Sequence, residues 1–232
     1  MKRLVIVMLY FLLVGMTGIG CARETPEPPP TSEKPAETPA PTGKPGEKPD
    51  TLSPEDPKEQ PTAGGIQAYL PLAVGNTWSY RGEGNEYASF TREVVYTEGN
   101  LAQIKENNGG TITSTVFRIT EDTVTRIFFQ GETYEEKNFL KEDPNDNTVI
   151  LTTPLEVGNL WNDDQGTRQI TELNANVETP AGRFDNCLVI EITSPNSKIL
   201  EYYKEGVGLV KREFRSNDTV VTSELENFKV GP

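Results

Sequence analysis

The sequence Pro71-Leu72-Ala73-Val74-Gly75-Asn76-Thr77-Trp78 recurs 83 residues later as Pro154-Leu155-Glu156-Val157-Gly158-Asn159-Leu160-Trp161, with six of the eight positions identical. Proline fixes its own φ angle, and glycine and asparagine tolerate positive φ. Pro-Leu-x-Val-Gly-Asn therefore predicts a turn that delivers the tryptophan onto the next strand. A large indole at that point would plug one end of the core. The repeat indicates either two structural corners from a duplicated half-domain or two aromatic platforms lining a ligand groove.

Short β-branched and aromatic runs, separated by Gly, Asn, Asp and Pro, surround both copies of the repeat. This pattern is typical of an all-β protein, and no long helical stripe interrupts it. A hairpin is expected at Glu121-Asp122. The expected strands are 90–96, 111–120, 123–130, 133–140, 149–151, 168–173, 184–192, 199–204, 209–214 and 219–228. Together they predict an antiparallel meander that forms a curved sheet, a half-barrel or a sandwich.

Residues 22–65 differ in composition from the rest of the chain. They hold 12 of its 18 prolines, no aromatic residue and a single leucine. Such a segment cannot bury enough apolar surface to offset its ordering entropy, so a disordered Pro-rich tether is expected. The chain then divides into a signal peptide at 1–20, a lipidated cysteine with its tether at 21–65, and one β-domain at 66–232.

The first 21 residues, MKRLVIVMLYFLLVGMTGIGC, predict export. Lys2 and Arg3 precede an apolar run of 11 residues, and small residues then lead to Cys21. The run is shorter than the roughly 20 residues of a membrane-spanning helix. Ile19-Gly20-Cys21 resembles the lipobox of bacterial lipoproteins, which implies that Cys21 carries a diacylglycerol group, with or without an N-acyl chain. The expected location is the extracytoplasmic side of the cell membrane, with the protein held there by lipid.

The β-domain is acidic, since its 15 basic and 26 acidic residues give a net charge of −11. Nucleic acids and anionic lipid headgroups bind basic surfaces, so neither is an expected partner of this domain. The absence of histidine excludes Ser-His and Cys-His nucleophile pairs and ordinary imidazole metal sites. The β-domain also lacks GxSxG, P-loop and GxGxxG motifs. We therefore expect a protein that is not an enzyme and binds no cofactor.

Two acidic loops, 143–147 and 162–166, concentrate the oxygen ligands that calcium prefers. Neither matches the EF-hand pattern, and the same residue types are typical of solvated turns, so no metal site is predicted. Cys187 begins an apolar strand and is expected to be a small packed residue. Because Cys21 is assigned to the lipid, no intramolecular disulfide is expected.

Aromatic side chains are the candidate ligand-facing groups of the β-domain. The pairs Phe128-Phe129 and Tyr202-Tyr203 place one ring on each face of a strand. One ring of each pair is expected in the core, and the other is expected to be half-covered or exposed, where it could contact a sugar or an apolar ligand. The candidates are Trp78, Tyr80, Trp161, Tyr202 and Tyr203.

Three motifs carry a wider resemblance: YLPLxVGNxWxY at 69–80, TPAGxFxNC at 179–187 and YYxxGVGLVK at 202–211. They resemble those of a set of uncharacterised bacterial extracytoplasmic β-domains that are common in lipoproteins of Gram-positive anaerobes. More distantly, the domain is similar to the curved half-barrel of the outer-membrane lipoprotein carrier superfamily. That resemblance implies an apolar cavity on the concave face of the sheet. It implies no catalytic residues, and a fold alone does not define a function.

The favoured function is a membrane-anchored, non-catalytic binding or accessory module for an apolar ligand, a glycan or an envelope protein. One alternative is a structural scaffold of the cell envelope. Another is a hydrolase of cell-wall polymer, which would need two carboxyl groups converging at about 5 to 9 Å, at least one with a raised pKa.

The lipobox assignment predicts the behaviour of a single substitution. Cys21→Ser removes the acylated atom, so the protein is expected to leave the membrane fraction and become soluble, as measured by fractionation and immunoblotting. Retention of the variant in the membrane would show instead that the apolar segment is the anchor.

Overall fold

The computed structural model describes residues 64–163 and 166–231, and the expected signal peptide and tether lie outside them. The described part is all-β apart from one 3-10 helix, η1 (Ile66–Tyr69). None of its helices is long and apolar enough to cross a membrane. The strands are β1 (Thr77–Glu83), β2 (Phe90–Glu98), β3 (Leu101–Asn107), β4 (Ile112–Ile119), β5 (Thr123–Gln130), β6 (Thr148–Thr152), β7 (Leu160–Asp163), β8 (Gly166–Thr179), β9 (Gly182–Ser194), β10 (Ser197–Lys204), β11 (Gly208–Ser216) and β12 (Thr219–Lys229).

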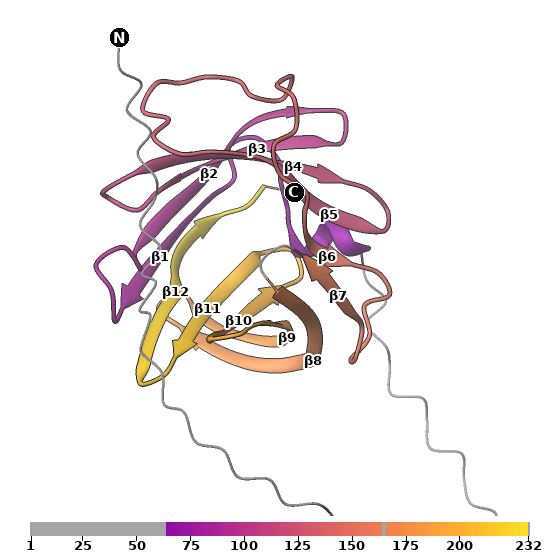
Figure 1. Cartoon of the computed structure of the whole chain (residues 1–232), viewed down its shortest axis with the longest axis vertical. Coiled ribbons are helices and arrows are strands. Elements are labelled where there is room, and N and C mark those ends of the chain that lie inside the picture. Colours follow the sequence, from indigo (N-terminus) through magenta and orange to yellow (C-terminus); the bar gives the residue numbers. More distant parts are fainter. Residues whose placement is uncertain (1–63, 164–165, 232) are drawn as a thin grey trace, which may run out of the picture. The chain divides into compact units, whose positions relative to one another are not determined.

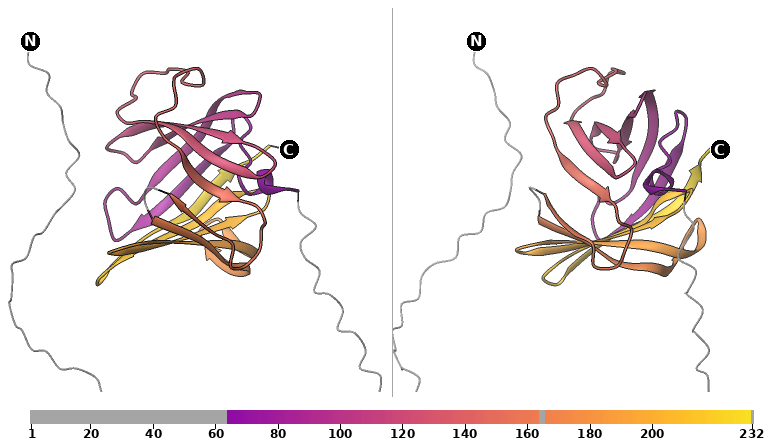
Figure 2. Two further views of the ribbon diagram at one scale, coloured as in Figure 1. Left: turned by 45° about the vertical axis from the view of Figure 1, so that its right-hand side comes forward. Right: turned by 90° about the vertical axis from the view of Figure 1, so that its right-hand side faces the viewer.

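All twelve strands form one antiparallel sheet in the order β6-β5-β4-β3-β2-β1-β12-β11-β10-β9-β8-β7 (Figure 1). Each half of the chain contributes a six-stranded meander, and the β1–β12 ladder joins the two. Figure 2 shows the two meanders facing one another across the interior. The sheet therefore curls into a barrel whose ends, β6 and β7, are not joined by a ladder in the described residues. The predicted antiparallel meander with a curved sheet is confirmed.

The first copy of the repeat forms a corner that leads into β1. Gly75 has a φ of 85°, which glycine adopts without strain. Its N–H donates to the carbonyl of Val94, and the N–H of Val94 donates back to the carbonyl of Asn76. The side-chain amide of Asn76 closes the turn by donating to the carbonyl of Pro71 at 2.7 Å.

The second copy repeats this geometry bond for bond before β7. Gly158 has a φ of 96°. Its N–H donates to Ile170, whose N–H donates to the carbonyl of Asn159. The Asn159 amide donates to Pro154 at 2.8 Å. The repeat is thus a structural corner used twice, as duplication of a half-domain would produce.

The two tryptophans that follow the corners also donate to backbone carbonyls, but at different places in the sheet. Trp78 donates its indole N–H to Val207, in the turn between β10 and β11, at 2.7 Å. Trp161, on β7, donates to Val149, on β6, at 2.8 Å. Trp161 therefore bridges the two sheet ends that no ladder joins, and we call the contact between β6 and β7 the seam.

One expected strand is wrong. Residues 133–140 form no strand, because four consecutive polar residues at 135–138 break the alternation that a half-buried strand requires. The segment instead places Phe139 and Leu140 in a second apolar cluster with Val116, Ile127 and Phe128. The buried Gln103 side chain forms hydrogen bonds with the backbone of this segment. It accepts from the Phe139 N–H and donates to the Lys137 carbonyl.

The bridge across the seam predicts the effect of Trp161→Phe. The substitution removes the indole donor and leaves the Val149 carbonyl without it, so the free energy of unfolding should fall by about 1–2 kcal/mol. Urea denaturation measures this loss, and hydrogen exchange should show faster opening of the β6 amides.

Trp78→Phe is the matched control, because Trp78 lies where the sheet ladders are continuous. It should lower stability without selectively accelerating β6 exchange. Unchanged β6 exchange in Trp161→Phe would mean that the indole does not hold the seam.

Candidate functional site

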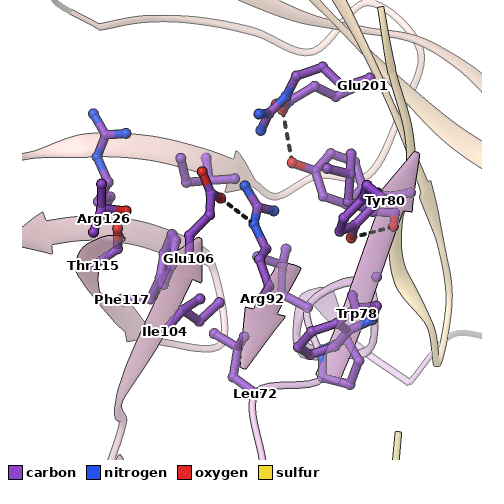
Figure 3. Close-up of a pocket in the computed structure, with 18 of the residues that line it drawn as sticks. Leu72, Trp78, Tyr80, Arg92, Ile104, Glu106, Thr115, Phe117, Arg126 and Glu201 are labelled. Carbon is purple, nitrogen blue, oxygen red and sulfur yellow. Dashed lines mark hydrogen bonds and ion pairs between the residues drawn. The ribbon is translucent and has the colours of Figure 1, made fainter. Parts of the chain in front are cut away.

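A cavity of about 280 Å³ lies inside the barrel, between the two meanders (Figure 3). Its walls combine apolar side chains with charged ones. The apolar lining comprises Leu70, Leu72, Trp78, Ile104, Phe117, Phe129, Ile150, Ile192, Ile199 and Leu209. The polar lining comprises Tyr80, Arg92, Glu106, Thr113, Thr115, Arg126, Arg168, Glu201, Tyr203 and Arg212. The site is therefore amphipathic, and not the purely apolar cavity that the sequence resemblance implied.

Strand alternation points the charged side chains inward. On β2, Arg92 lies between the buried Phe90 and Val94, which share its face because side chains two apart along a strand point the same way. On β10, Glu201 and Tyr203 share the inner face in the same manner. The same local rule that builds the core therefore places ionised groups inside it.

Arg92 and Glu106 are direct cross-strand partners on β2 and β3. The Arg92 Nε atom donates to the Glu106 carboxylate at 2.7 Å. Burial alone would raise the pKa of Glu106, but the guanidinium groups of Arg92 and Arg212 outweigh it and hold this pKa below its usual value. The Arg92 guanidinium also lies over the Phe90 ring at 5.0 Å and the Tyr80 ring at 5.9 Å. This side of the cavity is thus ionised and fixed.

Glu201 is the centre of the other charged cluster. Its Oε1 atom accepts from Nε and Nη2 of Arg212 at 2.9 and 2.8 Å, and its Oε2 atom accepts from the Tyr203 hydroxyl at 2.8 Å. Burial favours the neutral acid, but Arg212, Arg168 and the Tyr203 hydroxyl together lower the pKa of Glu201. Glu201 is therefore a buried carboxylate.

Two further arginines of the lining form ion pairs with aspartates outside the cavity. Arg126 donates to Asp146 at 2.7 Å and to Thr148 at 3.2 Å. Arg168 donates to Asp163 through Nε, and its Nη1 atom lies 3.8 Å from Glu201. Neither aspartate lines the cavity. The lining itself therefore carries four arginines against two glutamates, within a domain whose net charge is −11.

Three of the five candidate aromatics line this cavity: Trp78, Tyr80 and Tyr203. All three are almost fully buried and use their polar atoms within the protein, so they shape the wall more than they offer free faces. Burial raises the pKa of Tyr80 to about 12. Trp161 and Tyr202 are half-buried and do not line it.

Sequence reasoning missed the arginines. The available signal was a charged residue at an inward position of an apolar strand face, as at Arg92 between Phe90 and Val94. Such a residue must find a partner in the interior. The partner cannot be identified from spacing alone, because Glu106, Glu201 and Asp146 lie on other strands or loops.

The other groups considered as reactive or metal-binding sites make structural contacts. Burial raises the pKa of the Cys187 thiol to about 11, so it is protonated and unreactive at neutral pH. In the first acidic loop, Asp146 is engaged by Arg126 and Thr148, and Asn145 pairs with the backbone of Phe129. No group of three or more acidic, Cys or His residues in the described part of the chain is arranged to hold a metal ion.

Comparisons with known proteins assign no function to the chain. No family model matches it, and no curated protein sequence matches it. Two solved structures align with it: a candidate lipoprotein from Parabacteroides distasonis ATCC 8503, 16% identical with a TM-score of 0.42, and a candidate exported protein with a YmcC-like fold from Bacteroides fragilis NCTC 9343, 14% identical with a TM-score of 0.39. Each alignment covers 69% of this chain and 98% of the other. The resemblance to extracytoplasmic β-domains stays a prediction.

The Glu201 cluster predicts a pH-dependent loss of stability. Glu201→Gln leaves the buried Arg168 and the partly exposed Arg212 without their shared carboxylate, so the free energy of unfolding at pH 7 should fall by about 3 kcal/mol. The folded-state pKa of Glu201 is lowered, so its ionisation stabilises the fold above the unfolded-state value of about 4.3. That contribution disappears as the pH falls through the folded-state pKa, and the difference between wild type and variant should then narrow.

Urea denaturation of both proteins between pH 7 and pH 3 measures this difference. Glu224→Gln is the control, because its ion pair with Lys211 is partly exposed and should contribute less than about 1 kcal/mol. An equal loss for Glu201→Gln at all pH values would show that ionisation of Glu201 is not linked to folding.

Proposed function

We propose that this protein is a lipid-anchored, extracytoplasmic binding module whose β-barrel holds a small molecule with an apolar body. The cavity between the two meanders is the observation that carries the proposal. A core packed without a void would have left only partner binding or scaffolding. Benzene fills an apolar cavity of about 150 Å³, so 280 Å³ corresponds to a ligand of about 11 non-hydrogen atoms.

The anchor in this proposal is the lipid at Cys21, with the Pro-rich segment 22–65 as the tether. Both lie outside the described residues and are supported by sequence alone. The domain has no excess of basic residues to hold it on an anionic membrane, so a covalent lipid would supply the attachment. The protein would then sit on the outer face of the cell membrane.

The alternative of a carboxylate-dependent hydrolase is less well supported by the cavity. A general acid of that type needs a raised pKa. Arginines lower the pKa of both lining carboxyl groups, Glu106 and Glu201. The remaining alternative is an envelope scaffold, which would leave the cavity without a ligand.

The proposal predicts that a neutral amphiphile binds inside the barrel. The test uses the chain from residue 21 onward with Cys21→Ser, so that no attached lipid competes, and octan-1-ol as the probe in calorimetry and ligand-detected NMR. Thr115 lines the cavity, so Thr115→Phe should fill part of it and weaken octanol binding by about tenfold or more.

Thr91→Phe is the matched control, because Thr91 is exposed on the outer face of β2 and should leave binding unchanged. Native mass spectrometry of the acylated protein from its own membrane should also detect a bound small molecule. Absence of octanol binding, together with a bare protein that carries only a protein partner, would favour the scaffold.

A further inference from the structure

The cavity lining contains a deeply buried cation with an unused hydrogen-bond donor. The Arg168 side chain is only 5% exposed and lines the cavity. Its Nε atom is bound to Asp163, but its Nη1 atom makes no hydrogen bond within the described residues. The Oε2 atom of Glu201 is 3.8 Å away and beyond hydrogen-bond distance. A buried guanidinium donor without an acceptor is costly, and an acceptor entering the cavity would satisfy it.

Glu201 does not supply the acceptor that the Arg168 Nη1 atom lacks. Its Oε1 atom is taken by Arg212 and its Oε2 atom by Tyr203. The positive charges of Arg212, Arg168 and Arg92 all act on this one carboxylate. Arg168 and Arg92 have carboxylate partners of their own, Asp163 and Glu106, so the cluster is neutral overall, but Glu201 has no oxygen within hydrogen-bond distance of the Arg168 Nη1 atom.

Arg92, on β2 of the facing meander, adds further donors to the cavity. Only its Nε atom is bound, to Glu106, within residues 64–163 and 166–231. Its two terminal nitrogens carry N–H groups that make no hydrogen bond in this part of the chain. Arg168 and Arg92 thus offer unused donors on cations, which favour an acceptor that carries negative charge.

Exposure varies along the lining, from 5% for the Arg168 side chain to 40% for Phe129. Arg126 stacks over the Phe129 ring at 5.7 Å. Figure 3 shows Arg126 and Glu201 on opposite sides of the cavity. In the same view, Leu72, Ile104 and Phe117 lie together below Glu106 and Arg92 and form an apolar part of the lining.

We infer that the ligand is an amphiphile with an anionic head group, which docks against Arg168, Arg212 and Arg92 while its apolar chain lies against Leu72, Ile104 and Phe117. This inference rests on the proposed function and specifies the chemistry of its ligand. A cation would find both Glu201 oxygens already bonded and would leave the arginine donors unsatisfied. A neutral alcohol would accept a hydrogen bond from arginine without the charge assistance that a carboxylate provides.

The test compares three probes of one chain length on the chain from residue 21 onward with Cys21→Ser. Octanoate should bind at least about tenfold more tightly than octan-1-ol at pH 7.5, because its hydrogen bonds to arginine are charge-assisted. Octylamine should bind most weakly. Equal binding of octanoate and octan-1-ol would overturn the anionic head group and leave the proposed function standing. Failure of all three probes to bind would overturn both.

A charge-neutral double variant assigns the head-group site. Asp163→Asn with Arg168→Gln removes the buried pair together, and octanoate affinity should fall by about tenfold while octan-1-ol affinity changes little. The matched control is Lys211→Gln with Glu224→Gln, which removes an ion pair that does not line the cavity. Unchanged octanoate affinity in the first variant would overturn the assignment to Arg168. If that variant fails to fold, the ordering of the three probes on the parent chain still decides the inference.

Discussion

The carboxylate of Glu201 is the interaction on which the interior of this barrel depends. It joins Arg168 on β8, Tyr203 on β10 and Arg212 on β11 in one buried cluster. Without it, two guanidinium groups would face each other in a region of low dielectric, where isolated charge is strongly disfavoured. Asp163 and Glu106 pair with Arg168 and Arg92, so the interior is packed and ionised without excess charge, yet one buried donor of Arg168 stays unused. Arg168 lines the cavity.

Duplication explains why cations line the cavity on both sides. The two corners have the same hydrogen bonds, and each delivers a tryptophan whose cross-strand partner is an arginine. Trp78 pairs with Arg92 in the first meander, and Trp161 pairs with Arg168 in the second. Since the two meanders face one another, both arginines reach the same interior. Only the second tryptophan closes a seam, because only β6 and β7 are left without a ladder between them.

Much of the sheet could be predicted from the sequence, and the errors of that prediction have local causes. Nine of the ten expected strands exist, because alternation and turn residues are local signals. Strands β1, β3 and β7 were missed, since β1 and β3 mix charged, small and polar residues and β7 has only four residues. The strand predicted at 133–140 is wrong because the apolar residues of this segment belong to a loop that packs on the outside of β4 and β5. Three of the five aromatic residues proposed from the sequence line the cavity, but none of its four arginines was proposed.

The sequence by itself determined the all-β class, the two corners and the pattern that predicts a lipid-anchored, tethered domain. All of these depend on residues that are close together in the sequence, through their backbone preferences, their period-two alternation and their composition. Tertiary structure alone decided which acid neutralises which arginine, and which donor remains unused. Those contacts join distant residues, such as Trp78 and Val207, which are 129 positions apart. Closing a twelve-stranded sheet brings such groups together, and no local spacing specifies which of them will meet.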